Sequence, residues 1–286
     1  MAMLDPRTIG AHIRMKLPTL SKLEAQIVDN IIARNEFSEN TPIKDIAEEN
    51  HVSEAMIVKT AKKLDFSGYR ELRANLALYR QQEVSKMFQD ISPEDSIEKL
   101  IDKVFHNSIQ ALEETMAILD PAQIKRSTAL LCQADRLLFF GVGGSAQIAS
   151  DLAHKLLRIG ISAEVFSDTH MMLMAASLCD HDSAVLAVSH SGRTADVIEA
   201  VKLARSNGAR SVVLTNYGQS PLCEYADAVL TSTSQGASIL GENAASRIAM
   251  LNILDVLYVA IAERDLKKAE ENLSRTQAAV TAKRVH

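Results

Sequence analysis

The sequence predicts an α/β protein in two parts: an all-α helix-turn-helix domain, then a doubly wound α/β domain with a central parallel sheet. Helical periodicity fills the first third of the 286 residues, and from Asp135 onward short apolar strands alternate with helical stretches. A third observation is the sequence VLAVSHSGRT at residues 185–194, where an apolar strand runs into a hydroxyl-rich turn and then a helix. That turn offers amides at a helix N-terminus, which suits a phosphate.

Two capping signals mark where N-terminal helices begin. Ser21 and Glu24 have the spacing of a capping box, so we expect an amphipathic helix from Lys22. Thr41 followed by Pro42 is typical of an N-cap residue with proline at the first helical position. Both signals agree with an all-α N-terminal domain.

A helix-turn-helix unit is predicted directly after the second signal. A short helix at residues 43–49 is followed by a turn at 50–52, and Ser53 caps a second helix at 54–64. His51 stands where such turns usually have glycine. Histidine tolerates a left-handed backbone better than most residues, so the turn is weakened but not excluded.

The charge distribution is compatible with DNA binding by this unit. The whole chain has a net charge of −5, but residues 1–80 carry 12 basic and 11 acidic residues, and the basic ones gather in residues 59–80. A solvated helix face explains such a run about as often, and three-helix units that never touch DNA exist; pattern and charge together favour DNA binding. The predicted DNA-contacting residues are Ser53, Glu54, Ala55, Met56 and Lys59 on the recognition helix, Lys62 and Lys63 near phosphates, and Arg70 and Arg73 on the next helix.

The predicted domain boundaries follow changes in composition. We expect the helix-turn-helix domain at residues 1–80, a linker and connecting helix at 81–120, the α/β domain at 121–264 and a C-terminal helix at 265–286. Within the α/β domain, strands are expected at 136–141, 162–166, 183–188, 211–215 and 228–230, with helices at 147–159, 171–178, 195–207 and 244–262. In such sheets ligands bind beyond the carboxyl ends of the strands.

Two loops meet that requirement. The loop at 189–194 carries the hydroxyls of Ser189, Ser191 and Thr194 beside the start of a helix. The loop at 141–145 is rich in glycine but lacks the regular G-x-G-x-x-G spacing, so a dinucleotide site there is possible but poorly supported. Neither loop has the lysine of a nucleoside-triphosphate loop.

These residues resemble a known family. The 189–194 loop is similar to the S-x-S-G-x-T signature of sugar isomerase (SIS) domains, which bind phosphosugars. The segments VSEAMIVK at 52–59 and KLDFSGYRELR at 63–73 resemble the DNA-binding signature of the RpiR family of bacterial transcriptional regulators. The resemblance extends from about residue 20 to 263 and implies a helix-turn-helix domain fused to a SIS domain.

The resemblance implies an effector pocket and a role for each residue in it. Ser189, Ser191 and Thr194 would hold the phosphate, and His170 would bind a sugar hydroxyl, although a helix-capping or satisfied surface histidine is the plain alternative. Glu242 and Arg247 would close the pocket, with a purely structural role as the alternative for both. The implied effector-binding residues are Ser145, His170, Ser189, His190, Ser191, Arg193, Thr194, Glu242 and Arg247.

Two functions fit such a pocket. Aldose–ketose isomerisation needs a base and an acid, for which Glu242 and His170 are candidates. A sensor needs only different affinities for two conformations, and the fused helix-turn-helix domain favours it. We therefore expect a regulator that binds palindromic operator DNA as a homodimer or higher homo-oligomer. A repressor is the preferred interpretation, and the resemblance leaves an activator open. The effector of this regulator would be a phosphosugar of the ribose or allose type, or an N-acetylated amino-sugar 6-phosphate such as N-acetylmannosamine 6-phosphate.

Several other classes are disfavoured. The three cysteines are widely spaced and form no metal-ligand pair, so we expect no metal, no cofactor and a reducing cytoplasm. The first 16 residues lack the apolar segment of a signal peptide. We also expect no membrane partner, because apolar runs fall short of the roughly 20 residues that span a bilayer.

Overall fold

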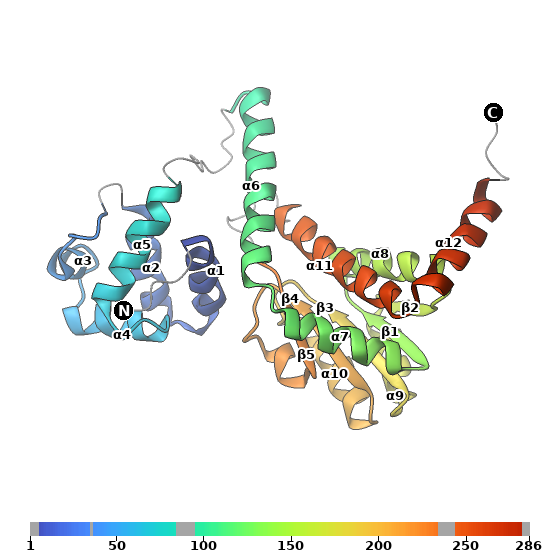
Figure 1. Cartoon of the computed structure of the whole chain (residues 1–286). Coiled ribbons are helices and arrows are strands. Elements are labelled where there is room, and N and C mark those ends of the chain that lie inside the picture. The colour runs from blue at the N-terminus through green and yellow to red at the C-terminus, as the bar shows by residue number, and fades with distance from the viewer. Residues whose placement is uncertain (1–5, 35–36, 84–94, 234–243, 282–286) are drawn as a thin grey trace. The chain divides into compact units, whose positions relative to one another are not determined.

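The computed structural model describes residues 6–34, 37–83, 95–233 and 244–281. These residues divide into two compact units, each described here by itself (Figure 1). The N-terminal unit contains the described residues up to Ile118 together with Thr233, and the C-terminal unit contains Leu119–Ser232 and residues 244–281.

The N-terminal unit is helical, as the sequence predicts. Its elements are α1 (Pro6–Lys16), the 3₁₀ turn η1 (Leu17–Thr19), α2 (Lys22–Ala33), α3 (Ile43–Glu49), α4 (Glu54–Lys63), α5 (Tyr69–Glu83) and α6 (Ile97–Ile118). The capping box at the start of α2 is confirmed: the Ser21 amide donates to Glu24 Oε2 at 2.8 Å, and the Glu24 amide donates to Ser21 Oγ at 3.4 Å.

Helices α3 and α4 form the predicted helix-turn-helix unit. Ile46 and Ile57 are both buried and belong to one core cluster of this unit. His51 has φ of +54°, so the left-handed turn expected at that position is confirmed. The capping prediction at α3 was wrong by one residue. Pro42 is the N-cap, and the Thr41 hydroxyl instead accepts from the Ser38 amide at 2.9 Å.

The C-terminal unit contains a five-stranded parallel sheet with the order β2-β1-β3-β4-β5. The strands are β1 (Arg136–Phe140), β2 (Ala163–Phe166), β3 (Ser183–Val188), β4 (Arg210–Thr215) and β5 (Ala228–Thr231). The strand order reverses between β1 and β3, which makes this junction the topological switch point where ligands of open α/β sheets bind. The doubly wound fold predicted from the alternating pattern is confirmed.

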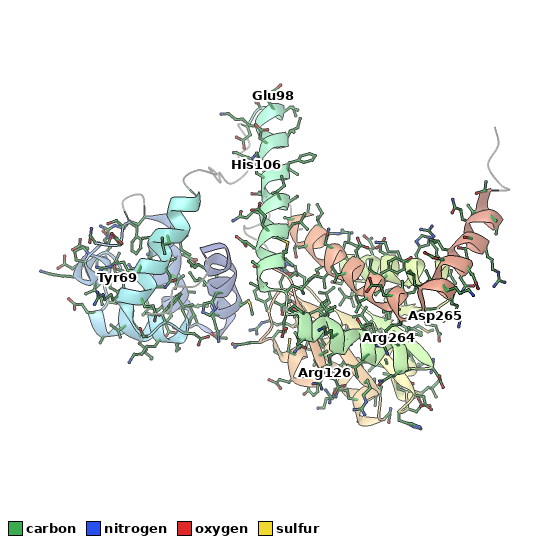
Figure 2. All side chains as sticks on the ribbon, viewed as in Figure 1. Tyr69, Glu98, His106, Arg126, Arg264 and Asp265 are labelled. Carbon is green, nitrogen blue, oxygen red and sulfur yellow. The ribbon has the colours of Figure 1, made fainter. Side chains whose placement is uncertain are left out.

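Helices cover both faces of the sheet. One face packs against α7 (Pro121–Gln133), α8 (Gly144–Arg158) and α11 (Ala244–Ala262), and the other against α9 (Thr169–Ser177) and α10 (Ala195–Ser206). The 3₁₀ turn η2 (Pro221–Tyr225) joins the second face, while η3 (Glu263–Asp265) connects α11 to α12 (Leu266–Thr281). Arg264 and Asp265 mark this last junction in Figure 2.

Helix α11 corrects the expectation about apolar length. The helical stretch Ala244–Thr281 is long and apolar enough to cross a membrane by length and composition. Its apolar side chains have another role in this fold, because Leu254 and Leu257 are fully buried and belong to the core between α11 and the sheet. A core helix of an α/β domain passes the same test of composition.

Candidate effector site and DNA-contacting surface

The candidate effector site begins where β3 ends. Every residue of β3 is buried, and Ser189 continues the ladder by donating its amide to the Leu214 carbonyl at 3.0 Å. The chain then folds back on itself, because the Gly192 amide donates to Ser189 Oγ at 3.2 Å. The Arg193 amide donates to Ser191 Oγ at 3.2 Å. The 189–194 loop is therefore held in shape by its own hydroxyls.

Gly192 fixes the loop against the turn below it. Its φ is +60°, and a Cβ on this residue would lie 1.9 Å from Ser220 Oγ. The Gly192 carbonyl accepts from the Leu222 amide of η2 at 3.1 Å. Only glycine fits this backbone conformation and this close approach together.

The end of the loop leaves the start of α10 open to an anion. Thr194 is the N-cap of α10 but makes no side-chain cap hydrogen bond; its Oγ1 lies 3.3 Å from Ser189 Oγ instead. Without a side-chain cap, the first-turn amides remain available, and the helix dipole favours negative charge there. Hydroxyls and amides of this kind suit a phosphate.

The loop that follows β1 lies at the same edge of the sheet. Since β1 and β3 are neighbours, the 141–145 loop and the 189–194 loop flank the switch point. Ser145 is half-buried in the first turn of α8. A Cβ on Gly141 would lie 3.0 Å from the Ala146 amide nitrogen, so glycine keeps this turn tight. The sheet order thus places Ser145 and the 189–194 loop at the same edge of the sheet, after neighbouring strands.

Two further predicted residues can be placed, and one cannot. Arg247 donates through Nη2 to Gln147 Oε1 at 2.7 Å, which holds it beside the first turns of α8. His170 is exposed in the first turn of α9, where Asp168 is the N-cap and accepts from the Met171 amide at 3.0 Å. The capping role considered for His170 therefore belongs to Asp168. Glu242 lies outside the described residues.

Sequence reasoning missed Asn216, which lies against the loop. Its Nδ2 is 3.1 Å from His190 Nε2, and its Oδ1 accepts from Ser246 Oγ at 3.2 Å and from Ser232 Oγ. His190 is exposed as a whole, but partial burial of its ring lowers the pKa of His190 below its ordinary value. A signal was present, because Asn216 follows β4 directly and so lies at the same sheet edge as the two loops.

The predicted DNA-contacting surface is centred on α4. Ser53 caps this helix by accepting from the Met56 amide at 3.3 Å. Met56, expected to point outward, is half-buried and packs against the core of the N-terminal unit. Exposed positions among the predicted residues are Ser53, Glu54, Ala55, Lys59, Lys62, Lys63 and Arg70.

Two of the predicted cations also have partners within the protein. Lys63 Nζ lies 2.7 Å from Glu24 Oε2, and Glu24 is buried. Arg73 Nη1 donates to the Thr41 carbonyl at 2.9 Å, and its guanidinium lies over the Tyr69 ring. Burial raises the pKa of Tyr69, labelled in Figure 2, to about 12. Lys63 and Arg73 therefore connect elements of the fold, a role that the charge pattern did not predict.

Fold and site together define a class of protein: a helix-turn-helix unit joined to an α/β domain of the SIS type, with a loop at its switch point whose hydroxyls and amides suit an anion. The SIS domain family matches residues 130–260, and the rpiR-family helix-turn-helix domain matches residues 8–83. The HTH-type transcriptional regulator RpiR of Escherichia coli (strain K12) is 36% identical over 277 residues, which cover 96% of this chain and 94% of that protein. The chain belongs to the RpiR family of helix-turn-helix transcriptional regulators, and it is a regulator rather than an enzyme.

Solved structures show the same fold. The Vibrio vulnificus NanR protein complexed with ManNAc-6P is 26% identical, with a TM-score of 0.62 over 96% of this chain and 100% of that one. The sugar isomerase domain of an RpiR transcription factor from Sphaerobacter thermophilus is 25% identical, with a TM-score of 0.58 over 63% of this chain and 99% of that one.

Proposed function

We propose that this regulator is a repressor of a sugar-catabolism operon, and that a phosphosugar bound at the 189–194 loop controls its affinity for operator DNA. The observation that carries the proposal is the loop itself. Its hydroxyls and the uncapped start of α10 form an anion site at the switch point of a domain fused to a helix-turn-helix unit. The likeness to NanR, solved with ManNAc-6P, supports a phosphosugar as the anion.

Each part of the site has a task in this proposal. Ser189, Ser191 and Thr194 hold the phosphate together with the amides of α10, and Ser145 reaches it from the neighbouring loop. His190 and Arg193 stand in the same loop, His170 contacts a sugar hydroxyl, and Glu242 and Arg247 close the pocket. Candidate effectors are N-acetylmannosamine 6-phosphate, allose 6-phosphate and ribose 5-phosphate, because the phosphate site does not select the sugar.

The DNA-binding form in this proposal is a cytoplasmic homodimer on a palindromic operator. Two exposed apolar helix faces support self-association: Ile101, Phe105 and Ile109 on α6, and Ile248, Val256 and Val259 on α11. Large exposed apolar patches mark interaction surfaces. The effector favours one arrangement of the two subunits, in which the recognition helices no longer match the half-site spacing, and repression is relieved.

The test is fluorescence anisotropy on DNA from upstream of the protein's own gene, with the three sugar phosphates as competitors. Ser189→Ala combined with Ser191→Ala should retain operator affinity but bind the effector about a hundredfold more weakly, because hydrogen bonds to charged groups contribute about 1.5–3 kcal/mol each. Ser274→Ala, at an exposed position on α12, is the matched control and should behave as wild type.

Three outcomes would contradict the proposal. If the wild-type protein binds no upstream DNA, or if none of the three sugar phosphates alters its DNA affinity, the function is wrong. If the double serine variant loses DNA binding and sugar response together, the loop is structural and the effector binds elsewhere.

A further inference from the structure

The side chain of Asn216 connects three segments that are far apart in the sequence. It is 6% exposed and contacts His190 of the 189–194 loop, Ser232 just after β5 and Ser246 of α11. Burying an amide costs free energy unless its polar atoms keep their hydrogen-bond partners. The loss of one contact of Asn216 is therefore expected to weaken the others.

The orientation of the Asn216 amide in the structure goes with one tautomer of His190. Both serine hydroxyls donate to Asn216 Oδ1, and Nδ2 donates to His190 Nε2 at 3.1 Å. A ring nitrogen that accepts carries no proton, so the proton of the neutral imidazole is on Nδ1. The His190 carbonyl is held too, because it accepts from the Asn216 amide at 3.1 Å and from Thr215 Oγ1 at 3.2 Å.

Ser232, one of the partners of Asn216, is joined by one peptide bond to Thr233, which is hydrogen-bonded to α6. Ser232, fully buried, is followed by Thr233, whose amide donates to Thr115 Oγ1 at 3.0 Å. The Thr115 hydroxyl in turn donates to the Thr233 carbonyl at 3.2 Å. We call this pair of hydrogen bonds the Thr115–Thr233 clamp. Thr115 and Thr233 are 3% and 2% exposed, so water does not compete for these hydrogen bonds. The division between the two units falls between Ser232 and Thr233.

We propose that Asn216 is a positioning residue that couples effector occupancy of the 189–194 loop to helix α6 through Ser232 and the Thr115–Thr233 clamp. This inference rests on the proposed function and assigns its means of regulation. An effector that contacts the His190 ring competes with Asn216 Nδ2 for Nε2. When the hydrogen bond to His190 is lost, the Asn216 side chain moves, and the hydrogen bond that its Oδ1 accepts from Ser232 changes. Helix α6 lies in the chain between the α/β domain and the helix-turn-helix domain, so a displacement of Thr233 acts on the segment that leads to the DNA-contacting helices.

The measurement is a coupling factor, the ratio of the operator Kd with saturating sugar phosphate to the operator Kd without it. The sugar phosphate is the member of the panel of three that acts on the wild type. Thr115→Val keeps the volume and removes both hydrogen bonds to Thr233. It should leave the Kd for operator and the Kd for sugar phosphate within about twofold of wild type while reducing the coupling factor at least fivefold, within the usual range of coupling.

Thr115→Ser, which retains the hydroxyl, is the control and should restore the coupling factor. If Thr115 had only a structural role, Thr115→Val would change the affinities for operator and sugar phosphate together with the coupling factor, or would change none of the three. A Thr115→Val protein that keeps a coupling factor within twofold of wild type overturns the proposal.

A second measurement separates this proposal from the proposed function, because it needs no effector. Asn216→Ala should speed amide hydrogen exchange in residues 111–118 of α6 relative to wild type, while strands β1 and β3 keep their protection as an internal reference. Unchanged exchange in α6, or faster exchange spread over the whole α/β domain, would overturn the coupling. If no sugar phosphate acts on the wild type, the proposed function fails and this comparison alone decides the coupling.

Discussion

The 189–194 loop and the α4 surface differ in how their functional groups are held. In the loop, the atoms expected to bind phosphate also form the turn: Ser189 Oγ accepts from the Gly192 amide and contacts Thr194 Oγ1. On α4, binding and folding are divided between residues, since Lys59 is exposed while Lys63 reaches buried Glu24. A motif therefore identifies the first kind of site, whereas a charge pattern mixes functional and structural cations in the second.

The strongest test of this comparison is Gly192→Ala. A Cβ there would collide with Ser220 Oγ, and its φ of +60° is strained for alanine. Because fold and binding share these atoms, we expect effector affinity to fall on the order of a hundredfold, the equivalent of about 3 kcal/mol of strain and lost contacts. Isothermal titration with the active sugar phosphate measures the loss, and operator affinity should stay unchanged.

Gly208→Ala is the matched control. Gly208 also has a positive φ, of +100°, but it lies at the C-terminal end of α10, away from the loop. This variant should lower stability and leave effector affinity as in wild type. Equal effector binding by Gly192→Ala and wild type would show that the loop is not the binding site.

The same contrast explains how much of the molecule the sequence predicts. Strand β3 and the helix-turn-helix unit are predicted almost to the residue, because residues 184–188 of β3 are an uninterrupted apolar run and Ser53 caps the start of α4. The 189–194 loop follows from the same logic, since a strand, a glycine turn and a helix leave little freedom for the chain.

What the sequence does not reveal depends on contacts between distant segments. Asn216 joins His190, Ser232 and Ser246 across the fold, and no local pattern encodes such a meeting. Arg73 matches the expected basic face but donates to the Thr41 carbonyl. Charge alone does not say whether a cation faces DNA or a neighbouring helix, so these roles require three-dimensional geometry.

The next prediction concerns the structural side of the comparison, at Glu24. The Lys63 ammonium and the Ser21 amide hold the pKa of Glu24 at about 2, below its ordinary value of 4.5. Because the pKa is lower in the folded protein, the ionised Glu24 carboxylate contributes to the free energy of unfolding. This contribution is complete above pH 4.5 and is lost as the pH falls toward 2. Glu24→Gln keeps the capping interaction but not the charge, so it should destabilise the N-terminal unit by about 1 kcal/mol at neutral pH.

Thermal unfolding of the full chain followed by circular dichroism measures this effect. The difference between wild type and Glu24→Gln should shrink as the pH falls below 4.5. Glu48→Gln is the control, because the Lys44–Glu48 pair is exposed at both ends and exposed pairs contribute little. A Glu24→Gln protein as stable as wild type at neutral pH would mean that the Lys63 contact does not support the fold.

The smallest expected effect separates two lysines one turn apart on α4. Lys59 has no ion-pair partner among the residues that the structure describes, so Lys59→Ala should weaken operator binding and reduce the slope of log K against log salt by about 1, without altering stability. Lys63→Ala should instead lower the unfolding midpoint and leave the slope as in wild type, because its ammonium is engaged by Glu24. Salt titrations of operator binding decide between them. If both variants reduce the slope equally, Lys63 contacts DNA as well, and the division of roles on this surface is wrong.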